Sequence, residues 1–341
     1  MKSVIYKKIF TILISVILTL TIIEIYLRLV VIKPWKNLKI EDPLINKSNL
    51  VLGWKAKEGK YDFLPMHENG NNFSLTIKKN GDRYNGNVNI NIKNEILLVG
   101  GSFTQGWGVN DKETFSFKLQ ENYKNYKIYN FGQAGYGSIQ SYLLLKEELE
   151  NFKSPKLIIY GIIQHHEYRN IAHEGWLRTM SLYSSRGSVT TPYGSLDEDN
   201  KLIFHSPIGY SNFPFKERSS IITLIEKVYN KLQSKKRVYK KSKSGERIKQ
   251  QTIVTKETII KMKEISEKNR SKFIIVNLDW AGSFKIENYR NFFKENKINF
   301  LNCSVPLDKK FAIPGDYHVN KQAHTFYKNC LVNYLEKENL L

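Results

Sequence analysis

Three polar residues with the chemistry of a nucleophile and its activating base stand far apart in the chain. Ser102 follows the apolar run Ile96–Val99 (ILLV) and two glycines. Asp316 and His318 lie two residues apart in the segment PGDYHVNKQAH. A histidine that removes a serine hydroxyl proton, and is itself held by a carboxylate, activates that serine for acyl transfer. We therefore expect Ser102, His318 and Asp316 to form a catalytic triad.

The glycines before Ser102 determine how its hydroxyl would be presented. Gly100 and Gly101 permit a sharp turn at the carboxyl end of a buried strand, which is where parallel α/β proteins hold their sites. The backbone N–H of Ser102 can then point into the same pocket and stabilise an oxyanion. A helix N-cap serine and a phosphate-binding glycine loop are the alternatives. The second is disfavoured because neither Gly-Lys-Ser/Thr nor the G-x-G-x-x-G spacing is present.

Two further strand ends bring candidate hydrogen-bond donors to the same edge. The segment NFGQAGYGSIQ is rich in glycines, whose N–H groups can face a ligand without obstruction. The segment YGIIQHHEYRN supplies Gln164, His165 and His166. Histidines also bind metals, but no HExxH or two-histidine-one-carboxylate spacing occurs, and adjacent side chains ordinarily point apart. We expect neither a metal nor another cofactor.

In this order and at strand ends, these segments resemble the conserved blocks of the SGNH (GDSL-like) serine hydrolases. GGSFTQGWGV resembles the first block, with Ser102 as nucleophile, and PGDYHVNKQAH resembles the last, matching Asp316 and His318. NFGQAGYG resembles the second, where Gly135 matches the glycine whose N–H serves the oxyanion hole. IKKNGDRYNG resembles the short Asn/Gly–Arg segment before the catalytic domain of membrane-anchored members. The resemblance runs from about Val51 to the C-terminus, apart from the stretch at about 170–250.

Two positions depart from the family pattern. Gly101 stands where the family has an aspartate before the nucleophile. The third block normally supplies an asparagine side chain to the oxyanion hole, and here that place falls on Gln164 or His165, depending on how the segment is aligned. Either side chain can donate a hydrogen bond. The resemblance thus implies an oxyanion hole made by Ser102, Gly135 and either His165 or Gln164.

The elements that would position these residues are visible in the apolar pattern. Strand-length apolar runs lie at Ile96–Val99, Lys127–Phe131, Leu157–Ile163, Phe273–Leu278 and Ile298–Leu301. Helical patterns alternate with them at Glu113–Tyr123, Ser138–Asn151, Thr255–Asn269, Glu287–Glu295 and Lys321–Glu338. Such alternation predicts an α/β domain with a buried parallel sheet. The family resemblance implies a flavodoxin-like three-layer sandwich.

An apolar segment precedes this domain. Residues 1–8 form a short basic tail, and residues 9–32 are long enough to span a bilayer. Glu24 and Arg28 interrupt the segment at a spacing that allows them to pair on one helical face. No small-x-small cleavage site follows, which favours an uncleaved transmembrane anchor over a removed signal peptide.

The rest of the chain divides into a linker with short strands and loops at 33–92 and the hydrolase-like domain at 93–341. An insertion or lid is expected at about 170–250, because such a length is too great for a plain connection. Its basic run, Lys235–Lys249, is interpreted as a solvated, mobile segment; contact with lipid phosphates or an anionic glycan is the alternative.

Charge and cysteine content add two expectations. Lys and Arg outnumber Asp and Glu by 53 to 32, giving +21. This balance is typical of proteins that meet nucleic acid, an anionic membrane or an acidic polymer, and also of chains from AT-rich genomes. We expect the membrane rather than nucleic acid. The two cysteines, Cys303 and Cys330, are interpreted as separately buried thiols, with a single bridge as the alternative.

The family resemblance implies a single-pass membrane protein whose catalytic domain lies outside the cytoplasm, in the periplasm or at the cell surface. It implies a serine esterase that hydrolyses or transfers an acyl ester. O-acetyl groups on an envelope polysaccharide are the first expected substrate, and lipid esters are the second. The competing class is a weak or inactive SGNH-like domain that binds glycan or scaffolds an envelope assembly.

Overall fold

A five-stranded parallel sheet forms the centre of the computed structural model, which describes residues 2–30, 33–34, 44–65, 70–89, 91–182, 189–241 and 243–341. Its strand order is β13-β12-β7-β5-β6. The strands are β5 (Glu95–Gly100), β6 (Lys127–Asn130), β7 (Leu157–Ile162), β12 (Lys272–Asn277) and β13 (Asn299–Asn302). This order is that of the flavodoxin-like doubly wound sheets. The expected fold class is confirmed.

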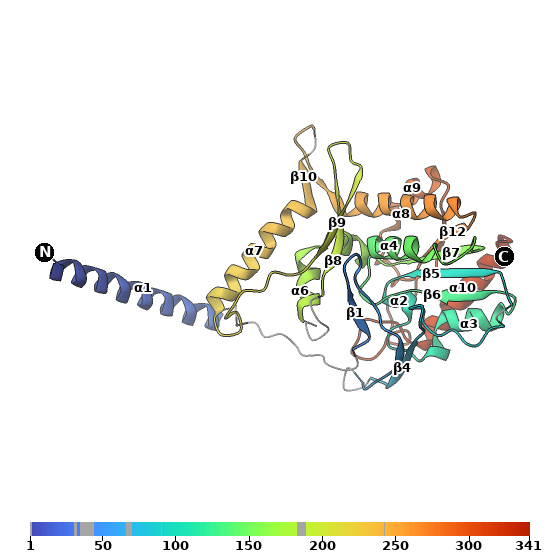
Figure 1. Ribbon diagram of the computed structural model, residues 1–341, viewed down its shortest axis with the longest axis horizontal. Helices are drawn as coiled ribbons and strands as arrows, with labels where there is room; N and C mark the ends of the chain where they lie inside the picture. Colours follow the sequence, from blue (N-terminus) through green and yellow to red (C-terminus); the bar gives the residue numbers. More distant parts are fainter. Residues whose placement is uncertain are drawn as a thin grey trace.

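Helices cover both faces of this sheet (Figure 1). Leu97 and Val99 of β5 belong to one core cluster, whereas Ile96 and Leu98 belong to the other. The first cluster is closed by α4 (Ser138–Glu148), α8 (Gln250–Lys268) and α9 (Arg290–Glu295), and the second by α3 (Phe115–Asn122) and α10 (Lys321–Lys337). Because both faces are buried, the central strands β5, β7 and β12 have apolar runs without alternation. The five expected helices are all present, although α8 begins five residues before the expected Thr255.

Short antiparallel strands precede the sheet. They are β1 (Asn46–Asn49) paired with β2 (Gly53–Ala56), and β3 (Gly59–Phe63) paired with β4 (Phe73–Ile77). Phe63 and Phe73 stack on each other, and Trp107 packs edge-on against both rings. Trp107 lies just after the nucleophile position, so this small cluster joins the upstream strands to the candidate site.

The segment between α5 (His165–Asn170) and α8 has elements of its own. They are α6 (Glu174–Leu182), β8 (Thr191–Leu196), β9 (Leu202–Ile208), α7 (Ser220–Val238), β10 (Tyr239–Lys241) and β11 (Arg247–Lys249). The strands β8 and β9 pair with each other, as do β10 and β11. The basic run interpreted as a mobile segment therefore forms the end of α7, a hairpin and its connection to α8. Residue 242 within it lies outside the described part.

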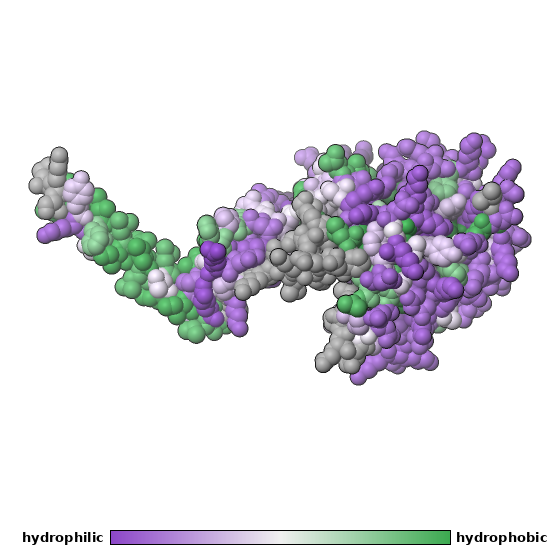
Figure 2. All heavy atoms as spheres, turned by 60° about the horizontal axis from the view of Figure 1, so that its bottom comes forward, coloured by the Kyte–Doolittle hydropathy of each residue, from purple (hydrophilic) through white to green (hydrophobic). Residues whose placement is uncertain are grey.

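The N-terminal helix α1 (Lys2–Val30) projects away from the rest of the molecule (Figure 1). Its stretch Val4–Val30 is long and apolar enough to cross a membrane, and its side chains are not buried in the protein. Figure 2 shows it as an apolar rod beside a largely hydrophilic body. By length and composition it fits a membrane anchor or a signal sequence equally. Residues 31–32, the end of the expected anchor, lie outside the described residues.

The two cysteines form a disulfide. Cys303 and Cys330 have Cα atoms 5.9 Å apart and are joined by an S–S bond. The expectation of two separate thiols is therefore wrong. Cys303 follows β13, and Cys330 lies on α10, which packs over the same core cluster. That packing, which the sequence spacing does not reveal, brings residues 27 positions apart within bonding distance.

Candidate active site

The structure brings Ser102, His318 and Asp316 together in the order expected of a triad. His318 Nε2 lies 2.9 Å from Ser102 Oγ, and His318 Nδ1 lies 2.7 Å from Asp316 Oδ1. A proton on Nδ1 donates to the carboxylate, which leaves Nε2 as the acceptor for the serine hydroxyl. The arrangement can therefore remove the hydroxyl proton of Ser102 while the carboxylate stabilises the imidazolium that forms.

Ser102 is the first residue of α2 (Ser102–Gln105), a short helix that begins where β5 ends. The first N–H groups of a helix have no partner within the helix. The backbone N–H of Ser102 is therefore free to face a ligand. Gly101 must be glycine, since a Cβ there would lie 2.8 Å from His166 Nε2 and 3.3 Å from the Tyr136 carbonyl oxygen. The space that an aspartate would need is already filled by α5 and the Tyr136 loop. This explains the departure from the family pattern.

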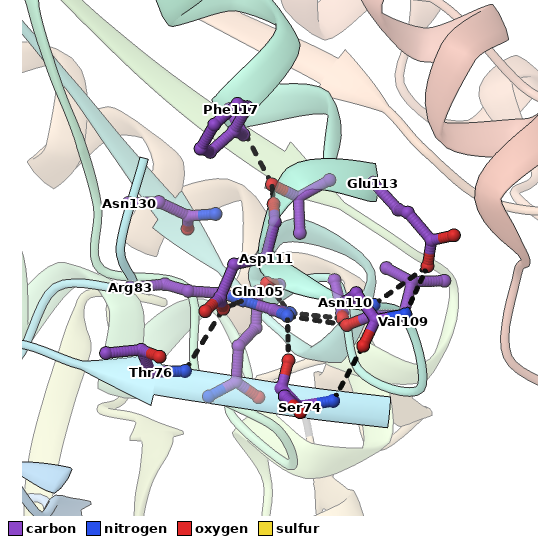
Figure 3. A network of polar contacts seen from close by, with 12 residues as sticks. Ser74, Thr76, Arg83, Gln105, Val109, Asn110, Asp111, Glu113, Phe117 and Asn130 are labelled. Carbon is purple, nitrogen blue, oxygen red and sulfur yellow. Dashed lines mark hydrogen bonds and ion pairs between the residues drawn. The ribbon is translucent and has the colours of Figure 1, made fainter. Parts of the chain in front are cut away.

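A buried arginine holds the far end of α2 (Figure 3). The guanidinium of Arg83 donates to the backbone carbonyls of Gln105, Gly106 and Val109 and forms a 3.1 Å ion pair with Asp111. Its side chain is fully buried. The resemblance had drawn attention to the segment containing Arg83 without giving the residue a role. Its contacts fix the loop that leaves the nucleophile helix, so Arg83 is a positioning residue.

The loop that carries the base is held by its own backbone. Asp316 Oδ1 accepts the His318 backbone N–H at 3.1 Å as well as the ring N–H. Ile313 and His318 are joined by a backbone hydrogen bond, and the Asp316 N–H donates to the Ile313 carbonyl. Asn320 caps α10 and donates from its amide to the carbonyls of Lys310 and Ala312. The D-x-H-x-N spacing thus places the base and attaches it to a helix.

Gly135 lies on a loop that is fixed to the nucleophile turn. The Gln133 N–H donates to the Gly100 carbonyl, and the Ala134 N–H donates to the Gln105 side chain. Gly135 has φ +89°, a left-handed conformation that favours glycine. Its N–H makes no hydrogen bond to any residue in the described part of the chain. It therefore remains available as an oxyanion donor.

Gln164 and His165 have different surroundings. The Gln164 amide donates to Glu167 at 2.8 Å, and its oxygen accepts the Lys285 N–H at 3.0 Å. Its side chain thus links α5 to the segment after β12. The His165 side chain reaches the surface at one end, while its ring packs beside Tyr168 and makes no hydrogen bond to another described residue. Desolvation, with the charges of Arg169 and His318, lowers its pKa to about 4. A neutral imidazole has one N–H to donate, so the His165 ring remains a candidate oxyanion donor.

Behind this edge lie His166, which the sequence placed here without a role, and Arg169 and Trp176, which were not singled out from the sequence. His166 Nδ1 shares a 2.7 Å hydrogen bond with the Tyr160 hydroxyl. Burial lowers the pKa of His166 well below its usual range. Arg169 donates to the Tyr136 carbonyl at 2.9 Å and lies over the ring of Trp176. Arg169 and Trp176 therefore support the loop that carries Gly135. The sequence Tyr-Arg-Asn at the end of α5 shows no apolar periodicity, so it did not indicate that Arg169 supports this loop.

A shallow groove runs beside the base. One cavity of about 510 Å³ is lined by the stretch Ala312–Tyr317 together with Lys309. A second, of about 560 Å³, continues along the same loop toward Asn71 and Asn110. Within the described ranges, no group of three or more His, Cys, Asp or Glu residues could hold a metal ion.

No protein-family model matches the sequence, and neither does any curated protein. Among solved structures, TesA is similar over 72% of this chain and 99% of its own, at 10% identity and a TM-score of 0.42. A lipolytic protein of the G-D-S-L family from Desulfitobacterium hafniense matches over 70% and 98%, at 12% identity and a TM-score of 0.40. An acetyl xylan esterase from the rumen bacterium Butyrivibrio proteoclasticus matches over 75% and 67%, at 13% identity and a TM-score of 0.40.

The strand order and the helices on both faces of the sheet are those of a flavodoxin-like fold, as expected from the sequence. At identities of 10–13% and TM-scores of 0.40–0.42, no residue role or substrate is transferred from the similar structures. The case for an activity rests on the geometry around Ser102.

Proposed function

We propose that the protein is a serine esterase that acts on an acyl ester through Ser102, His318 and Asp316. The observation that carries this proposal is the continuous pair of contacts from Ser102 Oγ to His318 Nε2 and from His318 Nδ1 to Asp316 Oδ1, at 2.9 Å and 2.7 Å. A structural serine at a helix start has no need of a carboxylate-held imidazole beside its hydroxyl.

The reaction has two halves. His318 removes the hydroxyl proton as Ser102 Oγ attacks the ester carbonyl, and the N–H groups of Ser102 and Gly135, with the His165 ring, donate to the oxyanion. When the intermediate collapses, the imidazolium of His318 protonates the departing alcohol, leaving an acyl-enzyme. Water then attacks this ester with His318 again as base. A sugar hydroxyl in place of water makes the same site a transferase.

O-acetyl groups on an envelope polysaccharide are the substrate class we propose first, with lipid esters second. The open groove along the base loop suits a polymer better than a buried acyl pocket would, and Lys309 lines it. We further propose that α1 anchors the protein with the catalytic domain outside the cytoplasm. The disulfide supports this orientation, because such bonds persist mainly in oxidising compartments.

A fluorophosphonate probe tests the proposed nucleophile. Such probes phosphonylate an activated serine, so wild-type protein should be labelled and Ser102→Ala should not. Ser116→Ala is a matched control, because that hydroxyl is also buried but hydrogen-bonds to Asn130 and lies outside the triad. If folded wild-type protein resists the probe, the esterase proposal fails and the glycan-binding alternative replaces it.

The substrate class is tested on purified envelope material. Polysaccharide fractions incubated with wild-type protein should release acetate, measured by enzymatic assay, whereas Ser102→Ala should release none. Acetate transferred to an added oligosaccharide, found by mass spectrometry, would identify a transferase. Release of fatty acid from envelope lipids without acetate would refute the polysaccharide assignment and leave the lipid ester in its place.

A further inference from the structure

Helix α7 has its polarity reversed relative to an ordinary surface helix. Its inward face is polar: the buried residues are Ser220, Thr223, Glu226, Asn230, Ser234 and Val238. Its outward face is apolar, and four large side chains there are 42–55% exposed: Ile225, Val228, Tyr229 and Leu232. A helix at a protein surface normally buries its apolar stripe and presents its polar face to water. We call these four outward residues the α7 stripe.

The polar inner face makes specific contacts, so the orientation of α7 is determined. Glu226 accepts the Phe213 N–H at 2.6 Å, and Asn230 exchanges hydrogen bonds with the backbone of Ser211. The Thr223 hydroxyl donates to the Lys216 carbonyl. Turning the helix to bury the α7 stripe would break all of these contacts. The stripe must therefore face whatever surrounds the protein.

The start of α7 is attached to α1. Glu24 accepts hydrogen bonds from the N–H groups of Ser220 and Ile221 and from the Ser219 hydroxyl, at 2.8–3.0 Å. Arg28 pairs with Glu24 at 2.6 Å and also donates to the Arg218 carbonyl. A carboxylate at the first N–H groups of a helix is favourable for the helix dipole. Glu24 thus caps a helix that lies nearly two hundred residues later in the chain.

We propose that the α7 stripe lies on the surface of the bilayer that α1 spans. The inference rests on the anchoring role proposed for α1. Glu24 follows the uncharged stretch Ile9–Ile23, and its contacts hold the start of α7 beside the C-terminal part of the membrane-spanning helix. Helix α7 therefore begins next to the bilayer. Exposed Lys231, Lys235 and Lys236 on the same helix suit anionic lipid headgroups. Phe215, 66% exposed in the turn before α7, adds an apolar contact at the same end.

A bilayer fits this face better than a partner protein would. The start of α7 is attached to α1, which is itself an exposed apolar surface. Interfacial helices sink an apolar face roughly 5–10 Å into the headgroup and acyl boundary, with basic residues nearby. The α7 stripe and its lysines have this composition. The consequence is that the catalytic domain is held against the membrane at two points, α1 and α7.

Fluorescence quenching tests the proposal in the full chain. Both native cysteines form the disulfide, so Val228→Cys or Leu232→Cys provides a single free thiol for an environment-sensitive fluorophore such as NBD. The matched control is Glu264→Cys, an exposed position on α8. Labelled proteins are reconstituted in nanodiscs of phosphatidylcholine and phosphatidylglycerol. Near-ultraviolet circular dichroism verifies that each variant is folded, and either stripe position alone suffices.

We expect the fluorophore at 228 or 232 to lose most of its emission to a lipid-borne nitroxide and to resist aqueous iodide. The fluorophore at 264 should behave in the opposite way. Iodide quenching at 228 and 232 equal to that at 264 would overturn the proposal. Protection from both quenchers would also overturn it, because the stripe would then be covered by protein. Carbonate extraction tests anchoring by α1 separately, so failure of the two ideas can be told apart.

Discussion

Replacing His165 by alanine would reveal whether this side chain completes the oxyanion hole. The ring of His165 has no described hydrogen-bond partner, whereas the amide of Gln164 is held by Glu167 and the Lys285 N–H. The sequence left these two residues as equal candidates for the third donor. The structure favours His165, because Gln164 would have to break two hydrogen bonds to reach the oxyanion.

The expected magnitude follows from the charge state of the ring. With a pKa of about 4, His165 is neutral at pH 7 and donates one ordinary N–H hydrogen bond. Loss of one neutral donor from an oxyanion hole lowers kcat by about 10²–10³, or about 2.7–4 kcal/mol. His165→Ala should therefore lower kcat on p-nitrophenyl acetate by that factor with KM little changed. The loss should be constant from pH 6 to 8, since the ring stays neutral over that range.

Gln164→Ala is the matched comparison. It removes the two hydrogen bonds of the amide, so it should lower the free energy of unfolding by about 0.5–1.5 kcal/mol for each of them and leave kcat unchanged. His165→Asn, which introduces the side chain that the SGNH family has at this place, should restore most of the rate. A fall in kcat for Gln164→Ala with none for His165→Ala would refute the assignment.

Three further predictions concern the triad, the arginine beneath it and a buried histidine. Asp316→Asn should lower kcat by about 10⁴ in steady-state assays with KM little changed. The reason is that the imidazole loses the carboxylate that selects its tautomer. A smaller effect than that of His165→Ala would contradict the triad. Arg83→Met should lower the free energy of unfolding by about 3–5 kcal/mol in urea titrations, because Asp111 loses its buried partner. A change near zero, as expected for an exposed residue, would contradict the structural role of Arg83. Burial lowers the pKa of His324 well below its usual range, so the unfolded chain binds a proton that the fold does not. Stability should therefore fall as pH drops below about 6.5, by up to about 1.4 kcal/mol per pH unit more than in His324→Asn.

The sheet and its helices could be predicted from the sequence because strands that are buried on both faces appear as continuous apolar runs. Strands such as Leu157–Ile162 are apolar at every position, and the helices between them follow the 3.6-residue period. Ser102 could be proposed for a related reason, since it follows the end of such a strand. Asp316 and His318 lie in the loop before α10 and were proposed from their spacing and the family resemblance. Their meeting depends on the sheet order, which the family resemblance supplied.

What the sequence could not provide depends on contacts between distant segments. Shifting the alignment of the third block by one residue exchanges Gln164 and His165 as the third oxyanion donor. The two residues can be told apart only by their hydrogen-bond partners in the structure. The pairing of Cys303 with Cys330 requires the packing of α10 near β13. The reversal of α7 was hidden because its period is that of any amphipathic helix. Which face is buried depends on the polar loop at 211–216.

The contacts of Arg83 have a consequence for where the catalytic unit begins. A truncation at residue 93, the boundary expected from the sequence, would remove Arg83 and leave the carbonyls of Gln105, Gly106 and Val109 without their donor. It would also remove Trp54, whose carbonyl accepts the Tyr136 hydroxyl on the Gly135 loop. The shortest chain that preserves the nucleophile turn therefore starts near Leu44. The contacts of Arg83 and Trp54 thus make the two upstream hairpins part of the folded unit that holds Ser102 rather than a tether.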